Sequence, residues 1–281
     1  MIDTVQRYLQ ILKRQPRPWK FLVSRVLWRT RLCSLFQIDK GNYRLRFYPT
    51  ALSAILWINP QDRAGDEFFL AQYLKPGDTV IDVGANIGHL ALDASALVGP
   101  GGRVYCVEAH PRTYKFLRKN VALNGSSNVV PFNLALGNSE SEIYFSDTRG
   151  DDQNHVSQNG SGIRVKMIRL DDLPISEGAI ELLKIDVEGY EKFVLEGASH
   201  TLRKVSCVYI ESDETHFAKY GYRCADPICL LQDNGFTMFR LTDDGLVAPI
   251  HAHYSSARCE NLIAVRNLEA FLQRTGFRRA V

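Results

Sequence analysis

The chain has 281 residues, of which 45% are hydrophobic and 23% are charged. This balance excludes an intrinsically disordered chain, and the length allows one large α/β domain or two small domains. The net charge of +3 is unevenly spread: residues 1–35 hold eight Lys or Arg residues against one acid, Asp3, a charge of +7 that leaves −4 on the rest.

No apolar run approaches the length that crosses a bilayer, and residues 1–36 lack the uninterrupted apolar core of a secretory signal. The six cysteines are dispersed, and even Cys224 and Cys229 with His216 match no common zinc spacing. We therefore expect a cytosolic protein with reduced thiols.

The first 41 residues predict a basic helical extension. Apolar residues at helical spacing over 5–32, broken by Pro16 and Pro18, indicate two short amphipathic helices. Trp19 and Trp28 among Lys and Arg suit an anionic membrane surface. The alternative is a helical cover over a substrate cleft, with its basic face in solvent.

Strands and helices then alternate. Patterns of apolar residues predict a strand over 42–48 and a helix over 66–74. Three further strands over 79–83, 103–107 and 128–134 are separated by helices over 89–98 and 111–124. This rhythm is typical of a parallel sheet covered by helices on both faces.

The second half interrupts and then resumes this rhythm. Two alternating strands, 142–145 and 163–170, flank a polar loop over 147–162, whose length is typical of a lid or of a disordered segment. The later elements are strands over 182–186 and 207–210, helices over 190–202 and 227–233, and two strands, 236–241 and 261–265, that predict a closing hairpin.

The glycine-rich turn 84–88, between a strand and a helix, favours a ligand site. Either a dinucleotide or S-adenosylmethionine could bind there. A dinucleotide turn would carry glycine where Asn86 stands, and Asp82 would repel a diphosphate but suits the α-ammonium group of methionine. Glu108, at the end of the next strand, could accept the ribose hydroxyls of either cofactor. We therefore favour S-adenosylmethionine; a turn without ligand would leave both acids unexplained.

Asp186 and Glu188 follow the strand that should lie opposite the cofactor turn. In doubly wound sheets the ligand lies at the carboxyl ends of the strands, where the strand order reverses. This placement brings both carboxylates to the predicted site, although an acid at this position can also cap the next helix.

Several ordered segments resemble the FkbM-type methyltransferases: DVGANIG at 82–88, VEAHP at 107–111, LKIDVEGYE at 183–191 and LEGA at 195–198. The resemblance covers about 42–265 and implies the class I Rossmann-like methyltransferase fold in a domain of residues 42–281. That fold has a mostly parallel seven-stranded sheet with a C-terminal antiparallel hairpin. The resemblance also implies S-adenosylmethionine as cofactor and O-methylation of a sugar, glycan or other natural product. Ala109 departs from the proline common in the family.

The candidate site residues fall into two groups. Asp186 and Glu188 are the leading candidates for the general base, and Glu211 could join Asp186 in holding a divalent cation such as Mg²⁺, or could form a salt bridge or cap. His89, His155 and His216 are rival bases. The predicted cofactor-binding residues are Asp82, Gly84, Asn86, Gly88, Glu108, Ala109, Asn133 and Ala135.

Two other functions remain as alternatives. A membrane-peripheral or scaffold protein could keep the cofactor fold without catalysis. Nucleic-acid methylation is disfavoured, because the body of the chain is acidic and has no Asn/Asp-Pro-Pro-Tyr-like element for a flipped base. The sequence identifies neither the acceptor nor the oligomeric state.

Overall fold

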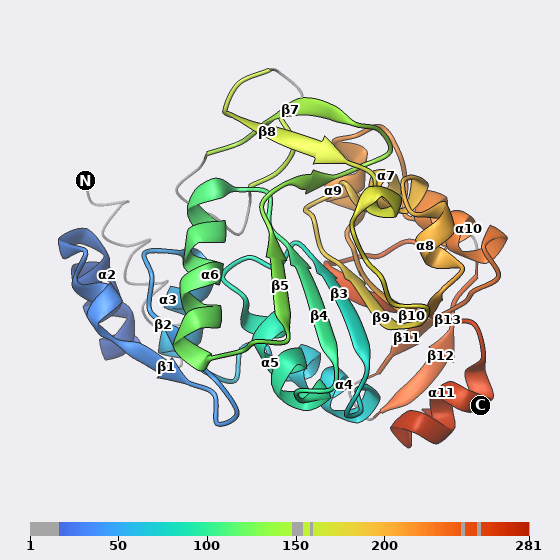
Figure 1. Ribbon diagram of the computed structural model, residues 1–281, viewed down its shortest axis with the longest axis horizontal. Helices are drawn as coiled ribbons and strands as arrows, with labels where there is room; N and C mark the ends of the chain where they lie inside the picture. Colours follow the sequence, from blue (N-terminus) through green and yellow to red (C-terminus); the bar gives the residue numbers. More distant parts are fainter. Residues whose placement is uncertain (1–16, 148–153, 158–159, 243–244, 252–253, 281) are drawn as a thin grey trace.

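The computed structural model describes residues 17–147, 154–157, 160–242, 245–251 and 254–280 (Figure 1). The helices are α2 (Pro18–Thr30), η1 (Leu32–Leu35), α3 (Ala51–Ile58), α4 (Ala64–Tyr73), α5 (His89–Val98), α6 (Pro111–Asn124), η3 (Leu170–Asp172), α7 (Glu191–Glu196), α8 (Ser199–Leu202), α9 (Glu214–Ala218), α10 (Ala225–Asp233) and α11 (Leu268–Thr275). The strands are β1 (Gln37–Asp39), β2 (Arg44–Arg46), β3 (Thr79–Val83), β4 (Arg103–Val107), β5 (Val129–Phe132), β6 (Ala135–Leu136), β7 (Ser141–Phe145), β8 (Ile163–Ile168), β9 (Ile180–Ile185), β10 (Val205–Ser212), β11 (Thr237–Leu241), β12 (Leu246–Pro249), β13 (Glu260–Val265) and β14 (Arg278–Arg279).

A large sheet forms the centre of the molecule. Within the described residues its order is β14-β12-β11-β13-β10-β9-β3-β4-β5, and the five strands from β5 to β10 are parallel. Counted along the chain, these five strands have the order 3-2-1-4-5 of doubly wound nucleotide-binding sheets. The strand order therefore reverses between β3 and β9, which is the predicted position of the ligand.

Alternate residues of each central strand enter two different cores. On β3, Val80 packs with α4, α5 and α11, whereas Ile81 packs with α7, α8 and α10 on the opposite face. All five residues of β3 are buried as a result. Helices thus cover both faces of the sheet, as the strand–helix rhythm predicted.

The C-terminal part differs from the predicted seven strands and hairpin. The described sheet has nine strands, because the short strands β12 and β14 extend its edge beyond β11. The hairpin partner of β11 is β12, and β13 crosses back to lie antiparallel between β11 and β10. The strand predicted at 261–265, β13, does pair with β11. However, β12 comes between β11 and β13 along the chain, so β11 and β13 do not form a hairpin.

A small second sheet lies beside the carboxyl ends of the central strands (Figure 1). Its order is β6-β8-β7, and the two strands predicted around the polar loop, β7 and β8, pair antiparallel. The loop expected as a lid falls partly on 148–153 and 158–159, which lie outside the described residues. Its described part joins β7, because Phe145 and Val156 form an isolated antiparallel bridge.

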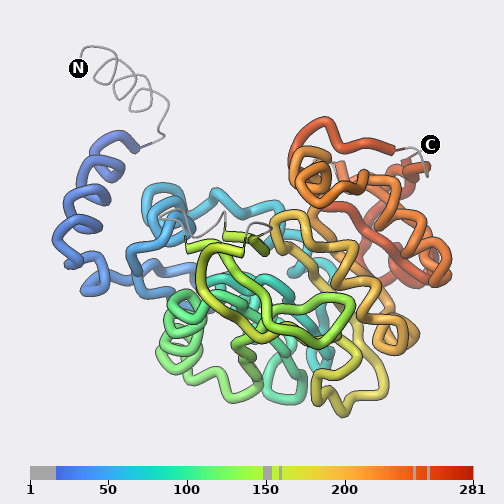
Figure 2. The backbone as a smooth tube through the Cα atoms, turned by 90° about the horizontal axis from the view of Figure 1, so that it is seen from above, coloured from blue at the N-terminus to red at the C-terminus, as the bar shows by residue number. Residues whose placement is uncertain are grey.

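The front of the chain packs on the central domain through its own core. Buried residues of β1, β2 and α3 cluster with Ile87 and Leu92 at the start of α5. Asn120 and Asn124 of α6 accept the backbone N–H groups of Arg46 and Arg44. The first predicted helix falls largely on 1–16, outside the described residues, and the second is α2, which stands out from the body in Figure 2. The β1–β2 hairpin spans the domain boundary predicted at residue 41, which stays a prediction.

Among the described residues, no helix has both the length and the apolar character that a membrane span requires.

Candidate functional site

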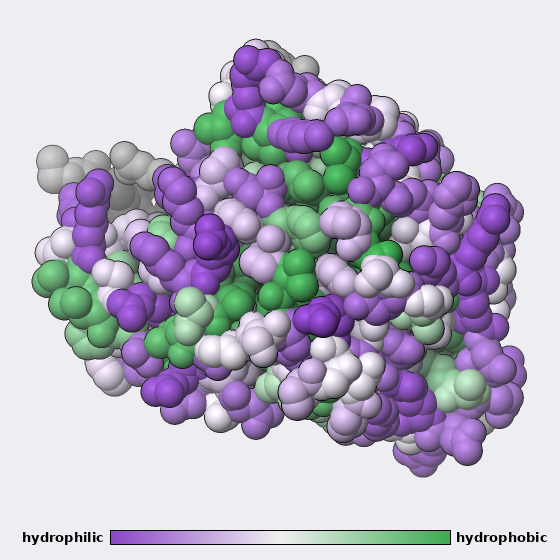
Figure 3. All heavy atoms as spheres, viewed as in Figure 1, coloured by the Kyte–Doolittle hydropathy of each residue, from purple (hydrophilic) through white to green (hydrophobic). Residues whose placement is uncertain are grey.

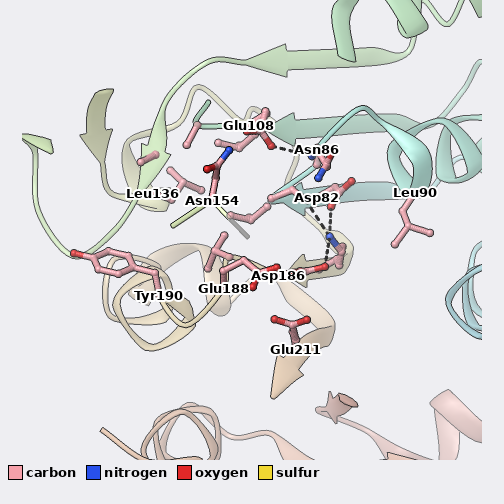
Figure 4. A pocket seen from close by; sticks show the side chains of 18 of the residues that line it. Asp82, Asn86, Leu90, Glu108, Leu136, Asn154, Asp186, Glu188, Tyr190 and Glu211 are labelled. Atoms are coloured by element: carbon pink, nitrogen blue, oxygen red, sulfur yellow. Dashed lines mark hydrogen bonds and ion pairs between the residues drawn. The ribbon is translucent and has the colours of Figure 1, made fainter. Parts of the chain in front are cut away.

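A pocket of about 1090 Å³, open to solvent, lies where the strand order reverses (Figure 4). Its wall includes the ends of β3, β4 and β9, the start of α5, and parts of β6, β7 and β10. Six of the eight predicted cofactor residues line it: Asp82, Gly84, Asn86, Glu108, Ala109 and Ala135. Gly88, the residue just before α5, and Asn133 do not line it. The three predicted catalytic residues Asp186, Glu188 and Glu211 also line it.

The backbone of the turn 84–88 is already hydrogen-bonded within the protein. Gly84 and Ala85 both donate to the carbonyl of Val107, at 3.0 Å each, and Gly88 donates to the carbonyl of Ala85 at 2.8 Å. The N–H of Ile87 is bonded to the side chain of Asn86, which itself has a positive φ of 49°. With the Asn86 N–H bonded to Glu108, each of the five N–H groups has an acceptor, so the turn offers no cradle of N–H donors for a diphosphate.

The fold itself requires glycine at positions 84 and 88, in addition to any contact with a ligand. Both have positive φ, and a Cβ at Gly84 would overlap the carbonyl oxygen of Asp186. A Cβ at Gly88 would lie 2.6 Å from Leu117 Cδ1. Glycine at 84 therefore lets β3 approach the end of β9, and glycine at 88 lets α5 pack against α6.

Glu108 is buried with its carboxylate held in one position. Oε2 accepts the Asn86 N–H at 2.9 Å, and Oε1 accepts the His110 N–H at 2.8 Å. Asn133 does not line the pocket but supports this loop, because its amide donates to the carbonyls of Glu108 and Ala109. A carboxylate fixed at the end of the second strand is the usual acceptor for ribose hydroxyls in such sheets.

Asp82 is paired with Lys184, a residue that the sequence interpretation did not assign to the site. The two residues are neighbours on β3 and β9, and Lys184 Nζ lies 3.0 Å from Asp82 Oδ1 and 3.5 Å from Asp186 Oδ2 (Figure 4). Burial would lower the pKa of Lys184, but the two carboxylates outweigh it and raise that pKa, so the side chain is charged. Asp82 Oδ2 has no hydrogen-bond partner among the described residues.

Asp186 lies between a cation and an acid. Burial and the carboxylate of Glu211 raise the pKa of Asp186 to about 6, while Lys184 acts in the opposite direction. The carboxylate is therefore mostly ionised at neutral pH, yet more basic than an exposed aspartate. These are the properties expected of a general base.

Glu188, Glu211 and His216 form a cluster next to Asp186. His216 Nδ1 lies 3.4 Å from Glu188 Oε2 and 3.8 Å from Glu211 Oε2, and one ligand atom from each residue lies within 4.8 Å of the others. Burial would raise the pKa of Glu211, but the nearby His216 and a hydrogen bond from Cys259 lower it. Glu188 has φ 58°, an uncommon conformation for a residue with a side chain. Asp186, which was predicted to share a cation with Glu211, is absent from this cluster of metal-ligating groups in the described chain.

The other two histidines differ in position. His89 lines the pocket at the start of α5, where burial first and the charge of Lys40 second lower its pKa to about 3. It is therefore neutral, and its Nδ1 lies 2.7 Å from the Tyr43 hydroxyl. The side chain of His155 does not belong to the pocket wall; the backbone carbonyl of this residue accepts the Ser146 N–H.

The described part of the polar loop also contributes to the pocket. Asn154 is buried and lines the pocket together with Val156, whose carbonyl accepts the Tyr220 hydroxyl at 2.9 Å. Arg63, just before α4, and Asp66, on α4, also line the pocket. Of these pocket residues that the sequence analysis did not assign to the site, Lys184 is the one whose role the sequence indicates. A charged residue within the apolar run 182–185 requires a buried partner.

A family model and several relatives with similar sequences are methyltransferases. The model of the methyltransferase FkbM domain matches residues 82–241. The hexuronic acid methyltransferase AglP of Haloferax volcanii is 31% identical over 181 residues, which are 62% of this chain and 72% of that protein. The 2-O-methyltransferase NoeI of Sinorhizobium fredii is 28% identical over 158 residues, 49% of this chain and 64% of that protein. Among solved structures, the methyltransferase FkbM from Methylobacillus flagellatus aligns with TM-score 0.44 and 14% identity, over 76% of this chain and 54% of that one.

Proposed function

The chain belongs to the family of methyltransferase FkbM domains, and on this basis we propose that it transfers a methyl group from S-adenosylmethionine to a hydroxyl of a sugar, glycan or other natural product. The names of the two relatives above describe a hexuronic acid methyltransferase and a 2-O-methyltransferase, which supports a sugar-like acceptor. We propose no nucleic-acid substrate.

The hydrogen bonding of the turn 84–88 is the observation that carries the choice of cofactor. A dinucleotide needs free N–H donors for its diphosphate, and those of this turn are bonded internally. In contrast, the unpartnered Oδ2 of Asp82 suits the methionine ammonium group, and the fixed carboxylate of Glu108 suits the ribose hydroxyls. The residues present therefore fit S-adenosylmethionine.

S-adenosylmethionine, when bound, supplies an electrophilic methyl group on a positively charged sulfur. The protein must align an acceptor hydroxyl with that group and remove its proton. Asp186 is our candidate for the proton acceptor. Lys184 orients this carboxylate and favours its ionised form, and with a pKa of about 6 it is mostly ionised at neutral pH even though Glu211 acts in the opposite direction.

Calorimetry tests the choice of cofactor. We expect the protein to bind S-adenosylmethionine and S-adenosylhomocysteine but not NAD. Glu108→Gln should weaken both interactions about tenfold or more, since a hydrogen bond to a charged group contributes about 1.5–3 kcal/mol. Glu269→Gln, on the exposed side of α11, is the matched control. Binding of NAD without binding of S-adenosylhomocysteine would overturn the proposal, and cofactor binding without turnover on any acceptor would favour the non-catalytic alternative.

We also propose that a divalent cation assists the reaction, held by Glu188, Glu211 and His216. Two carboxylates and an imidazole are suitable donors, and their spacing of up to 4.8 Å allows one ion to contact all three. This set replaces the pair Asp186 and Glu211, because Lys184 already compensates Asp186. A cation here would lower the pKa of a bound hydroxyl.

Metal binding can be measured without an acceptor. We expect Mn²⁺ to bind the protein in paramagnetic resonance titrations, and His216→Asn to lose at least tenfold in affinity. His200→Asn changes an exposed histidine on α8 and should bind as the wild type does. Unchanged Mn²⁺ binding in His216→Asn, or full activity after exhaustive chelation, would remove the cation from the proposal.

A further inference from the structure

The exposed apolar side chains of the molecule are concentrated at its front. Seven of the nine large hydrophobic side chains that are exposed within the described residues lie between positions 19 and 36, and Leu35 is 74% exposed. Figure 3 shows apolar side chains over α2, at the left of the view. We call these seven residues the front patch: Trp19, Leu22, Val23, Val26, Leu32, Leu35 and Phe36.

α2 is apolar on two opposite sides, of which the fold uses one. Phe21 and Ser24 are buried on the side that packs against α3. Trp19, Leu22, Val23 and Val26 follow the spacing i, i+3, i+4 and i+7, so they form a stripe on the opposite side, in solvent. A helix needs only one apolar side to dock on its own domain. Of the outer stripe, Trp19 has an edge contact with Trp57 on α3, with ring centroids 6.4 Å apart, yet it remains 61% exposed, and the rest of the stripe is exposed as well.

The charges around the front patch have one sign. Residues 17–35 contain Arg17, Lys20, Arg25, Arg29 and Arg31 and no acid. Lys20 is bonded to the carbonyl of Trp57, and none of the four arginines takes part in an ion pair with a described residue. An apolar stripe flanked by unpaired cations matches the surface of a bilayer that contains anionic lipids.

Residues 17–51, the described part of the front, do not take the other predicted role, a helical cover over the cleft. None of the described residues before Leu52 lines the pocket. Leu52 belongs to α3, and α3 is the helix on which α2 packs. The front patch is therefore not needed to close the pocket, although it lies only one helix away from it.

We infer that the front patch and its arginines bind the surface of an anionic membrane, which would hold the pocket next to acceptors at that surface. The apolar stripe enters the boundary between headgroups and acyl chains, where tryptophan is favoured. The arginines attract acidic headgroups, and salt screens this attraction. This inference concerns location and does not depend on the proposed reaction.

Vesicle co-sedimentation of the full chain tests the inference. We expect binding to phosphatidylcholine vesicles with about 30% phosphatidylserine to be at least tenfold stronger than to pure phosphatidylcholine, and to weaken between about 0.05 M and about 0.5 M salt. The double variant Trp19→Ser/Val26→Ser should lose at least tenfold in affinity, and so should Arg25→Gln/Arg29→Gln.

Matched controls distinguish loss of the front patch from a general loss of positive charge or of folding. Arg278→Gln/Arg279→Gln removes two exposed arginines from β14 and should bind vesicles as the wild type does. All variants should keep the melting temperature and the S-adenosylhomocysteine affinity of the wild type. Equal binding to both vesicle types, no binding at low salt, or full binding by the front-patch variants would overturn the inference. A dimer that the Trp19→Ser/Val26→Ser variant abolishes would assign the patch to a second copy of the chain instead.

Discussion

Lys184 connects the two ends of the candidate site. Its ammonium group contacts Asp82, on the cofactor side, and Asp186, on the acceptor side, at 3.0 and 3.5 Å. Removing it would leave the buried Asp82 and the partly exposed Asp186 without their cation, and an unpaired buried carboxylate such as Asp82 costs several kcal/mol in typical proteins. Lys184 therefore orients both carboxylates. The sequence around Lys184 does not identify these two partners.

The raised pKa of Asp186 leads to a prediction about rate and pH. If Asp186 accepts the proton, the rate of methyl transfer should fall as the pH drops through about 6, because protonation removes the base. Asp186→Asn should lower turnover by about 10²–10⁴, while its affinity for S-adenosylhomocysteine stays within a few-fold of the wild type. The measurement is the transfer of labelled methyl groups from S-adenosylmethionine to a panel of sugar acceptors.

The control for this variant is Asp233→Asn, at the exposed end of α10. It should keep the rate and the pH profile of the wild type. Near-normal turnover by Asp186→Asn would assign the proton transfer to another group, and a flat pH profile in the wild type would do the same.

At the scale of elements, the sequence predicts what depends on local pattern. The strands at 79–83 and 103–107 and the helix at 89–98 occur where predicted, because runs of apolar residues end at turn-forming residues. The predicted helix at 190–202 divides into α7 and α8 around Gly197. The edge strands β12 and β14 have only four and two residues, too few to give a periodic pattern, so the predicted sheet lacked them.

The sequence predicts those site residues that lie at the carboxyl ends of strands. Asp82, Glu108 and Asp186 follow from that rule together with the strand order of doubly wound sheets. The pair of Asp82 with Lys184 requires the register between β3 and β9, and the burial of Asn154 requires the path of a loop across the pocket. Neither the register nor this path has a signal within one short stretch of sequence.

At the scale of the whole molecule, the front of the chain and the central sheet share a core. Leu45 on β2 is fully buried in a cluster with Ile87, within the cofactor turn, and Leu92, on α5. The side chains of Asn120 and Asn124 also bind the backbone of β2. These contacts connect residues 33–58 to α5 and α6, so we expect the front and the sheet to unfold together in one transition.

Leu45→Ala tests this cooperativity. Truncation of a fully buried leucine costs about 2–5 kcal/mol, which lowers the melting temperature of a large domain by roughly 2–4 °C for each kcal/mol. We expect calorimetry to show one transition displaced as a whole, and cofactor affinity to fall because the cluster supports the start of α5. Leu35→Ala, at a side chain that is 74% exposed, should leave the transition unchanged. A separate early transition, with the main one unmoved, would instead mean that the front folds independently and that the boundary near residue 41 divides two units.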